Sequence, residues 1–579
     1  MLVLKGIAAS PGVAIGPAVL LPGDNFAVSR QYIEPAEVKA ELQKMHHAMQ
    51  KTLDELDACE KKVLSTLGAE YANLMSTHKL ILQDPALKDS VAKKIRTEHL
   101  SAQAALFLTL QELASAFDKI EDPFFKERRN DIFDVGKRLV NNLEGGKREF
   151  LASINKPSLL VAHNLYPSDT INLQENQVIG FCTDVGGKTS HTALLAQSLN
   201  LPAVVGLSTA SKDVKSGDTL IIDGENGLLV INPDRYTLAN YRKIQREIKK
   251  TDALLKTINH LPVITQDGRG VKLYVNYDPR TDNKDNKRLI TDGLGLLRTE
   301  FLYMDTPTPP TEDDQYRMYL AVLKRFDMRP TAIRLADLGA DKMPDFPLDE
   351  FDKDANPFMG CRGIRLFLKN PDLLYTQLRA IVRTACEVPA QVKIMIPMVS
   401  AVEEVRHVRT AFNEVLKEFE AKGKKPLNRV ALGAMIEVPA AAIALDGMIG
   451  ELDFISIGTN DLIQYLIAVD RVNQEVAHMY DPCHPAVART INQIIQTAHK
   501  RNKRVCICGE IAADSRMLPL LLGLGVDALS VTPRMYLRVK NNIRNLNFEN
   551  CSDLAQAALL MGSSAEIRQL IDNNKNEDS

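Results

Sequence analysis

The strongest constraint on the fold is a series of eight short apolar segments that follow Pro262, with gaps between them long enough for helices. Each segment has the length and composition of a buried strand. Eight strands that alternate with helices over roughly 300 residues are the pattern of a (β/α)8 barrel. We therefore predict a barrel domain over residues 262–579, with strands at Val271–Tyr277, Gly293–Leu297, Ala332–Ala336, Val392–Ile396, Val430–Ile436, Phe454–Ile457, Val505–Ile507 and Ala528–Val531.

Polar residues stand at the carboxyl ends of most of these predicted strands. In a closed barrel these ends meet at one rim, which is where barrel enzymes place their active residues. Each such side chain, taken alone, is more often a solvated surface group. Their shared position at strand ends favours a functional site, which we predict to be formed by Asn276, Arg298, Arg334, Glu437, Asn460, Asp461 and Cys508.

The chemical types of these side chains predict an anionic ligand that carries a metal ion. Glu437 and Asp461 follow neighbouring strands, and two carboxylates can hold a hard divalent ion, with Mg²⁺ as the expected metal. Arg298, Arg334 and Arg471 carry planar groups suited to bidentate contacts with phosphate or carboxylate. For each arginine an exposed ion pair is the ordinary alternative, and the position at a strand end favours the ligand.

A thiol is also predicted at the rim. In the sequence VCICGE, Cys506 and Cys508 share one face of a strand, and only Cys508 reaches the strand end. A buried, inert thiol is the usual explanation of a barrel cysteine. With a bound enolate in reach, Cys508 can instead act as a proton donor, because a thiol keeps its proton at neutral pH.

The region from Glu34 to Glu144 has a helical pattern. Glycine occurs there only at Gly68 and Gly136, and apolar residues recur every three or four positions. This periodicity predicts helices that pack as hairpins with polar outer faces. The pattern leaves open whether the helices form a purely structural bundle or a docking surface for a partner protein.

The residues on both sides of this helical region have a different character. Short β-rich runs separated by turns occupy residues 157–233, and the opening sequence GIAASPGVAIGPAVLL is similar to them. The helical region is therefore expected to be an insertion into one α/β domain. We predict an α/β domain at residues 1–22 and 148–233, a helical subdomain at 23–147 and a linker helix at 234–261.

A candidate nucleophile lies in the α/β domain. His191 ends the sequence GGKTSH and precedes the helical stretch ALLAQSL, so it is placed near a helix start. The free N–H groups there can stabilise a phosphate carried on the imidazole, while Thr189 or Ser190 caps the helix. A single histidine is usually structural, but the glycine turn and the hydroxyl groups favour function. A nucleotide-binding P-loop is excluded because Cys182 stands where its first glycine is needed.

Composition restricts the partners and the compartment. A net charge of −2 over 579 residues argues against general binding of nucleic acid or anionic membranes. No apolar run approaches the roughly 20 residues of a membrane span, and the N-terminus lacks a signal sequence. The eight cysteines lack zinc or disulfide spacing. We expect a cytoplasmic protein without membrane insertion.

Several of these motifs occur together in one known family. The sequence GGKTSHTALLAQSLNLPAVVG, the segments around Arg298 and Arg334, NPFMGCRGIR, and the stretch DFISIGTNDLIQYLIAVDR at residues 453–471 resemble Enzyme I, the phosphoenolpyruvate-protein phosphotransferase of the bacterial sugar phosphotransferase system. The resemblance runs from GIAASPGVAIG almost to the C-terminus.

This resemblance implies a phosphoryl relay. In such a relay phosphoenolpyruvate and Mg²⁺ phosphorylate His191, pyruvate leaves, and the phosphoryl group passes to the histidine phosphocarrier protein HPr, for which the helical subdomain is the dock. Members of the family are typically homodimers through the barrel. By motif, the resemblance implies that Cys508 protonates the enolate and that Glu437 and Asp461 hold the metal. It assigns substrate binding to Arg298, Arg334, Asn460, Asp461 and Arg471, and adds Lys342 and Arg362 around the phosphate.

Two other functions are compatible with parts of the sequence. A phosphoenolpyruvate synthase or dikinase shares the phosphohistidine and barrel modules, but this chain has no room for the large ATP-binding domain of those enzymes. A non-catalytic phosphoenolpyruvate sensor is the second alternative. The complete set of chemically competent residues argues against a sensor.

Overall fold

The computed structural model shows that the chain divides into two compact units, residues Met1–Thr251 and Asp252–Ser579. The structure describes the chain except for residues 22–30, 67–68, 118–131, 133, 137, 141, 144–153, 155, 166–176, 188–191, 194–195, 197–198, 200, 280–288, 305, 340–341, 343, 345, 347–355, 472, 474 and 578–579.

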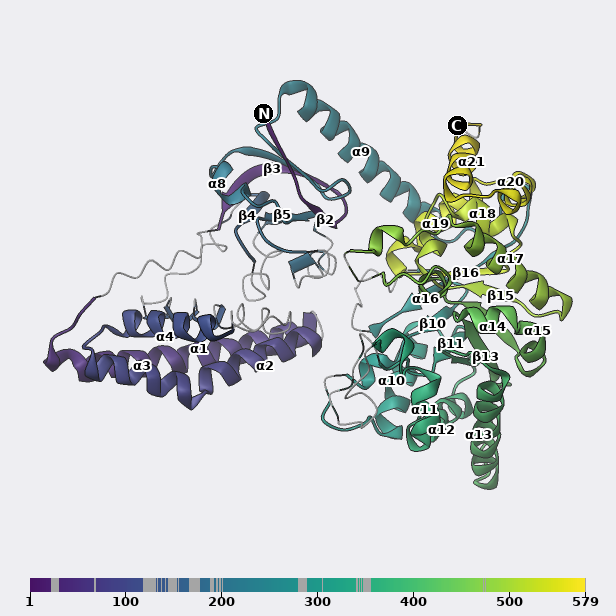
Figure 1. The fold of residues 1–579 in the computed structure, drawn as a ribbon, viewed down its shortest axis with the longest axis horizontal. Coiled ribbons are helices and arrows are strands. Elements are labelled where there is room, and N and C mark those ends of the chain that lie inside the picture. Colours follow the sequence, from purple (N-terminus) through teal and green to yellow (C-terminus); the bar gives the residue numbers. More distant parts are fainter. Residues whose placement is uncertain are drawn as a thin grey trace. The chain divides into compact units, whose positions relative to one another are not determined.

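The first unit contains a group of long helices, which Figure 1 draws as a bundle. Their bounds are α1 (Val38–Thr66), α2 (Ala69–Gln83), α3 (Pro85–Thr97) and α4 (Ala102–Phe117). The start of α3 shows why the chain turns there: the Asp84 side chain accepts a hydrogen bond from the Ala86 N–H, and Pro85 occupies the first helical position. Leu56, Leu82 and Ile95 are fully buried in the shared core of these helices.

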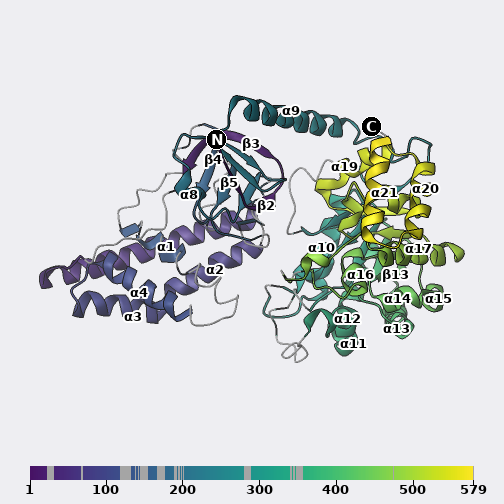
Figure 2. The same ribbon diagram turned by 45° about the horizontal axis from the view of Figure 1, so that its top comes forward.

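The rest of the first unit is built on a mixed sheet. Among the described residues its strand order is β1-β8-β7-β3-β4-β5-β6-β2, and β3, β4, β5 and β6 run parallel. Strands β3, β4 and β5 of this sheet are labelled in Figure 2. The strand bounds are β1 (Leu2–Lys5), β2 (Ile7–Ser10), β3 (Val13–Leu20), β4 (Ser158–Ala162), β5 (Val178–Thr183), β6 (Ala203–Val205), β7 (Thr219–Asp223) and β8 (Leu228–Ile231).

This sheet joins the first residues of the chain to residues far along the sequence. Strand β3 pairs with β4, and β1 pairs with β8. In the sequence, the helices α1–α4 therefore lie between β3 and β4, which are neighbouring strands of one sheet. Alternate residues of β4 enter different clusters, with Leu160 on one face and Leu159 on the other, as the two-residue period of a strand requires. The exact domain boundaries proposed above stay predictions. Two further helices are α8 (Ala210–Asp213), which lies between β6 and β7 in the sequence, and α9 (Arg235–Thr257), which begins in this unit and ends in the next.

The second unit contains a closed barrel whose described strands are all parallel. The predicted fold class is confirmed. Seven predicted strands agree with the observed ones within one residue at each end; the predicted strand at Ala332–Ala336 is observed at Thr331–Arg334, so Arg334 is its last residue. The bounds are β9 (Lys272–Tyr277), β10 (Leu294–Leu297), β11 (Thr331–Arg334), β12 (Val392–Ile396), β13 (Ala431–Ile436), β14 (Phe454–Ile457), β15 (Val505–Ile507) and β16 (Ala528–Val531).

Helices and short turns connect these strands and cover the barrel. The α-helices are α10 (Glu312–Arg325), α11 (Ile364–Lys369), α12 (Pro371–Glu387), α13 (Val402–Ala421), α14 (Pro439–Ile443), α15 (Leu445–Met448), α16 (Thr459–Leu466), α17 (Pro485–Lys500), α18 (Leu518–Gly523), α19 (Pro533–Arg544), α20 (Phe548–Leu560) and α21 (Ser564–Glu577). Single 3-10 turns include Glu300–Leu302 and Glu510–Ala513, which follow β10 and β15.

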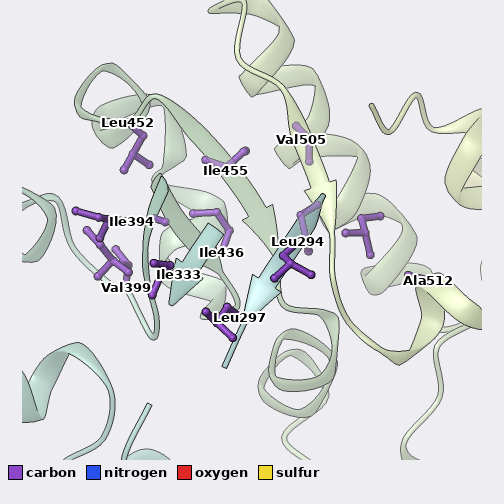
Figure 3. Close-up of a cluster of buried hydrophobic side chains, with 14 of the residues drawn as sticks. Leu294, Leu297, Ile333, Ile394, Val399, Ile436, Leu452, Ile455, Val505 and Ala512 are labelled. Carbon is purple, nitrogen blue, oxygen red and sulfur yellow. The ribbon is translucent and has the colours of Figure 1, made fainter. Parts of the chain in front are cut away.

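Strand periodicity divides the barrel residues into two sets. Leu294, Ile333, Ile436 and Ile455 belong to the large cluster that joins strands and helices, and Figure 3 shows them projecting from their strands. Ala332 belongs instead to a small separate cluster that also contains Leu296, Met395, Met435 and Cys508. Because side chains two residues apart share a face, Arg334 extends on the same side as Ala332.

Candidate active site at the carboxyl rim of the barrel

The predicted site residues lie at the carboxyl ends of several barrel strands. Arg334 ends β11, Glu437 follows β13, and Cys508 follows β15. Asn460 and Asp461 lie in the first turn of α16, directly after β14. The parallel pairing of β11 through β15 brings all these strand ends to one rim.

Asp337 is the centre of an ion-pair cluster at the β11 end. Its carboxylate accepts two hydrogen bonds from Arg362, from Nε at 3.2 Å and from Nη2 at 2.8 Å. Arg334 Nη1 and Lys342 Nζ lie 3.5 and 3.6 Å from Asp337 Oδ2. Burial works to raise the pKa of Asp337, but the charges of Arg362, Lys342 and Arg334 outweigh it and hold the pKa far below its usual range. Asp337 is therefore a buried anion.

Glu300 gives Arg334 a second carboxylate partner. Arg334 Nη2 donates to Glu300 Oε1 at 2.8 Å, and both side chains are buried. The same oxygen accepts the Asp337 N–H at 3.0 Å. Burial acts to raise the pKa of Glu300, and the nearby Arg334 and Lys342 charges lower it overall. The guanidinium of Arg334 is thus held in place before any ligand binds, which favours a fixed anion-binding geometry.

Glu437 has the opposite electrostatic environment. Burial raises its pKa to about 8, and repulsion from Asp461 and Asp337 adds to the rise against the attraction of Arg334. Glu437 Oε1 accepts the Met398 N–H at 2.7 Å. A Cβ atom built on Gly458 would lie only 2.4 Å from Glu437 Oε2, so glycine is required there to make room for the carboxylate.

Asp461 lies beside this carboxylate. It is 8% exposed, and its Oδ1 is buried with no hydrogen-bond partner among the described residues, although Arg362 Nη1 is 3.6 Å away. Arg362 Nη1 also donates to Tyr465 Oη at 3.3 Å, so this guanidinium connects the Asp337 cluster with the Asp461 side of the rim.

The Glu437 and Asp461 carboxylates fit a divalent cation. The pKa of Glu437 is raised by burial and by its anionic neighbours, while Asp461 has a buried oxygen to which no residue in the described part of the chain donates a hydrogen bond. Within the described ranges no group of three or more His, Cys, Asp or Glu side chains forms a metal cluster. Two protein carboxylates leave coordination positions open, which is typical of Mg²⁺ sites where substrate oxygens complete the shell.

The thiol of Cys508 faces the same site. It is buried, and its Sγ lies 3.5 Å from the Ile457 carbonyl oxygen. Burial raises the pKa of Cys508 to about 11; Ser456 acts to lower it, Glu437 to raise it, and Arg334 and Arg298 to lower it. The thiol therefore keeps its proton at neutral pH, and the charged groups that act on its pKa include Glu437, Arg334 and Arg298 of the predicted site.

The remaining predicted residues lie on the more open side of the rim. Arg298 follows β10 with an exposed side chain, and Arg471 is partly buried, its N–H donating to Gln464 Oε1 at 3.2 Å. Asn276, at the end of β9, donates from Nδ2 to the carbonyl oxygens of Cys508 and Ser530 at 2.9 and 3.0 Å. Asn276 thus braces the thiol-bearing strand end.

His191 lies outside the described residues, so its surroundings stay a prediction. The glycine turn that precedes it is described as far as Gly187. Next to that turn, the buried Asp184 carboxylate accepts the Ser211 N–H at Oδ1 at 2.9 Å, and its Oδ2 lies 3.0 Å from Nδ1 of the exposed His163. This cluster ties the ends of β4 and β5 together.

Glu300, Asp337 and His163 are among the cluster residues that the sequence pattern did not predict. Glu300 stands two residues after Arg298 in RTE, and Asp337 stands three residues after Arg334 in RLAD. That proximity was a usable signal, because buried arginines need carboxylate partners. Nothing in the sequence pattern indicated that His163 pairs with Asp184 across two strands.

Comparison with known proteins places the fold and site in one class. Three family descriptions match the chain: the N-terminal domain of phosphoenolpyruvate-utilising enzymes at residues 5–128, their mobile domain at 154–227, and their phosphoenolpyruvate-binding domain at 252–548. The last match covers the barrel whose rim carries the site. The fold and site are those of a phosphoenolpyruvate-utilising enzyme.

Curated relatives identify the family within the phosphoenolpyruvate-utilising enzymes to which the chain belongs. Proteins named phosphoenolpyruvate-protein phosphotransferase match almost end to end: that of Haemophilus influenzae is 37% identical over 98% of both chains, and that of Geobacillus stearothermophilus 37% identical over 97% of this chain and 96% of its own. The Bacillus subtilis protein is 36% identical over 97% and 98%. The chain belongs to the phosphoenolpyruvate-protein phosphotransferase family, also called Enzyme I. No described helix is long and apolar enough to cross a membrane.

Proposed function

We propose that this chain transfers the phosphoryl group of phosphoenolpyruvate to His191 and from there to a histidine of an HPr-type carrier protein. The observation that carries the proposal is the meeting of Arg334, Glu437, Asp461 and Cys508 at one barrel rim, in a chain related end to end to the phosphotransferases. Arginines for the anion, carboxylates for a cation and a protonated thiol are the groups this reaction needs.

Substrate binding is assigned to the cationic side of the rim. Arg334 is fixed by Glu300 and Asp337, so it meets a phosphate or carboxylate without rearrangement. Arg298, Arg471 and the amide of Asn460 would supply further donors. Glu437 and Asp461 would hold Mg²⁺, which when bound neutralises charge on the transferring phosphoryl group.

The reaction then needs a nucleophile and a proton. A nitrogen of His191 forms a bond to phosphorus as the bond between phosphorus and the enol oxygen breaks, which leaves the enolate of pyruvate. Cys508 donates its thiol proton to the methylene carbon of that enolate, and pyruvate results. A thiol whose pKa lies near 11 is protonated beforehand and is acidic enough to serve as this donor.

The two reacting groups belong to different units of the chain, so we propose that His191 visits the barrel and then its acceptor. The helical subdomain is the proposed HPr dock. A homodimer through the barrel and a cytoplasmic location complete the proposal; the eight cysteines are all free thiols, which suits a reducing compartment.

The test is phosphate incorporation from labelled phosphoenolpyruvate and Mg²⁺ without ATP, with pyruvate release followed in parallel. We expect acid-labile label in the native chain and none in His191→Ala, with transfer to HPr only from the native chain. Absence of label in a folded, metal-loaded native protein would overturn the proposed enzymatic function and favour a phosphoenolpyruvate sensor.

A further inference from the structure

Asn460 and Glu510 form a reciprocal pair across two loops of the rim. Asn460 Nδ2 donates to Glu510 Oε1 at 2.9 Å, and the Glu510 N–H donates to Asn460 Oδ1 at 2.8 Å. Asn460 lies in the first turn of α16, and Glu510 begins the 3-10 turn that follows β15. The pair therefore joins the loop of Asp461 to the loop of Cys508.

The pair fixes the orientation of the Asn460 side-chain amide, with its oxygen toward the Glu510 N–H and its nitrogen toward the Glu510 carboxylate. A backbone N–H can only donate, so the atom of Asn460 that faces the Glu510 N–H must be oxygen. The Glu510 carboxylate can only accept when ionised, so it requires the amide nitrogen on its own side. A rotated amide would place oxygen against carboxylate and N–H₂ against N–H, and both contacts would be repulsive.

This orientation matters for an anionic ligand. An asparagine amide has two N–H donors, and Glu510 accepts one of them. The second N–H is the donor that the proposed function assigns to phosphoenolpyruvate. With the amide rotated, an oxygen would face the ligand, and attraction to a phosphate or carboxylate would become repulsion.

The surrounding contacts keep the two loops together. A Cβ atom built on Gly509 would lie 1.7 Å from Thr459 Oγ1, so the loops touch one residue before the pair. Tyr480 Oη donates to the Asn460 carbonyl oxygen at 3.4 Å. The backbone of Asn460 is thus held from a second side, and its side chain is the part that Glu510 still has to orient.

We infer that Glu510 is a positioning residue for substrate binding, which orients the Asn460 amide so that an N–H faces the anionic substrate. The inference rests on the proposed function and extends it by one residue. Glu510 itself makes no contact with the reacting atoms in this assignment. Its role needs a hydrogen-bond acceptor rather than a negative charge, because an amide oxygen would orient Asn460 equally well.

The experiment compares five variants of the full chain in the steady-state release of pyruvate. Glu510→Ala should lower kcat/KM about tenfold, mainly through KM, as expected for one lost hydrogen bond. Glu510→Gln should keep kcat/KM near that of the native chain. In an Asn460→Ala background, adding Glu510→Ala should not lower kcat/KM further.

The fifth variant separates amide orientation from a mere tie between loops. Asn460→Asp combined with Glu510→Gln preserves a reciprocal pair, because the new carboxylate accepts from the glutamine N–H₂ and from the backbone N–H. It removes the donor toward the substrate, so its kcat/KM should fall as low as that of Asn460→Ala. Calorimetric melting of each variant checks that the barrel remains folded.

Three results would overturn the inference while leaving the proposed function intact: independent effects of Glu510→Ala and Asn460→Ala that multiply, a Glu510→Gln variant as impaired as Glu510→Ala, or full activity in the exchanged pair. A native chain that accepts no label and releases no pyruvate would overturn the proposed function and this inference together.

Discussion

The two sides of the barrel rim treat buried carboxylates in opposite ways. At the β11 end, Asp337 is surrounded by Arg334, Lys342 and Arg362, and its pKa is held far below its usual range. At the β13 and β14 ends, burial and then repulsion from Asp461 raise the pKa of Glu437 to about 8. On one side several cations surround a single carboxylate, whereas on the other two carboxylates repel each other and Arg362 lies 3.6 Å from Asp461.

This difference indicates separate roles for the two sides of the rim. Burying an ion without a partner is costly, so a neutralised cluster forms a stable frame that does not depend on a ligand. A cluster with excess negative charge gains most when a cation binds. We therefore assign structural support and anion binding to the β11 side, and metal binding to the β13 and β14 side.

The largest expected effect follows from removing the cation. Treating the protein with a chelator should lower phosphorylation by phosphoenolpyruvate at least about 10³-fold, since a metal ion supplies several kcal/mol of charge stabilisation in phosphoryl transfer. Rapid-quench measurement of acid-labile label checks this, and added Mg²⁺ should restore the rate. Unchanged phosphorylation in metal-free buffer would remove the proposed distinction between the two sides.

The second prediction compares stability on the two sides. Asp337→Ala leaves Arg362 and Arg334 buried without this partner and should cost about 3–5 kcal/mol of stability in the barrel unit. The matched change Glu437→Gln replaces a carboxyl group that is mostly protonated at pH 7 in the metal-free protein, so it should leave the metal-free stability unchanged or higher. Calorimetric melting of both variants without metal checks the contrast; equal losses would show that the two sides are electrostatically alike.

The third prediction concerns the Cys508 thiol, whose pKa is influenced by Arg334 from the first side and by Glu437 from the second. Cys508→Ala should lower the rate of pyruvate formation about 10²-fold, as expected for loss of a general acid. With the donor gone, the enolate should take its proton from solvent without a facial preference. The configuration of the pyruvate methyl group, determined with isotopically labelled substrate in deuterated water, checks this. Retained stereochemistry would assign the proton to another group.

The smallest effect is a pH dependence of stability. Because folding raises the pKa of Glu437 from 4.5 to about 8, the protonated carboxyl favours the folded state. This contribution is complete below pH 4.5 and is lost as pH rises through 8. Between pH 7 and pH 9 the metal-free protein should lose up to about 1.4 kcal/mol through this group.

Glu437→Gln is the control for that pH dependence. The variant cannot titrate at this position, so its denaturation midpoint should fall less than that of the parent between the same two pH values. Parallel slopes for the two proteins would assign the pH dependence to other groups.

Much of the barrel and its rim could be predicted because the relevant signals are local. Runs such as Phe454–Ile457 are apolar, short and followed by turn residues, so both the strand and its end are visible in the chain. The rim residues Glu437, Asp461 and Cys508 were predicted for the same reason. Only the exact end of one strand, at Arg334, differed by more than one residue.

The sequence by itself determined which residues reach the rim, because the alternation of side chains along a strand and the position of its end depend on residues that are close in the sequence. Tertiary structure alone decided which of them are neutralised and which repel each other. Arg362 meets Asp337 across 25 positions, and Asn460 meets Glu510 across 50. Charges and hydrogen bonds act through space, so these pairings follow from barrel closure.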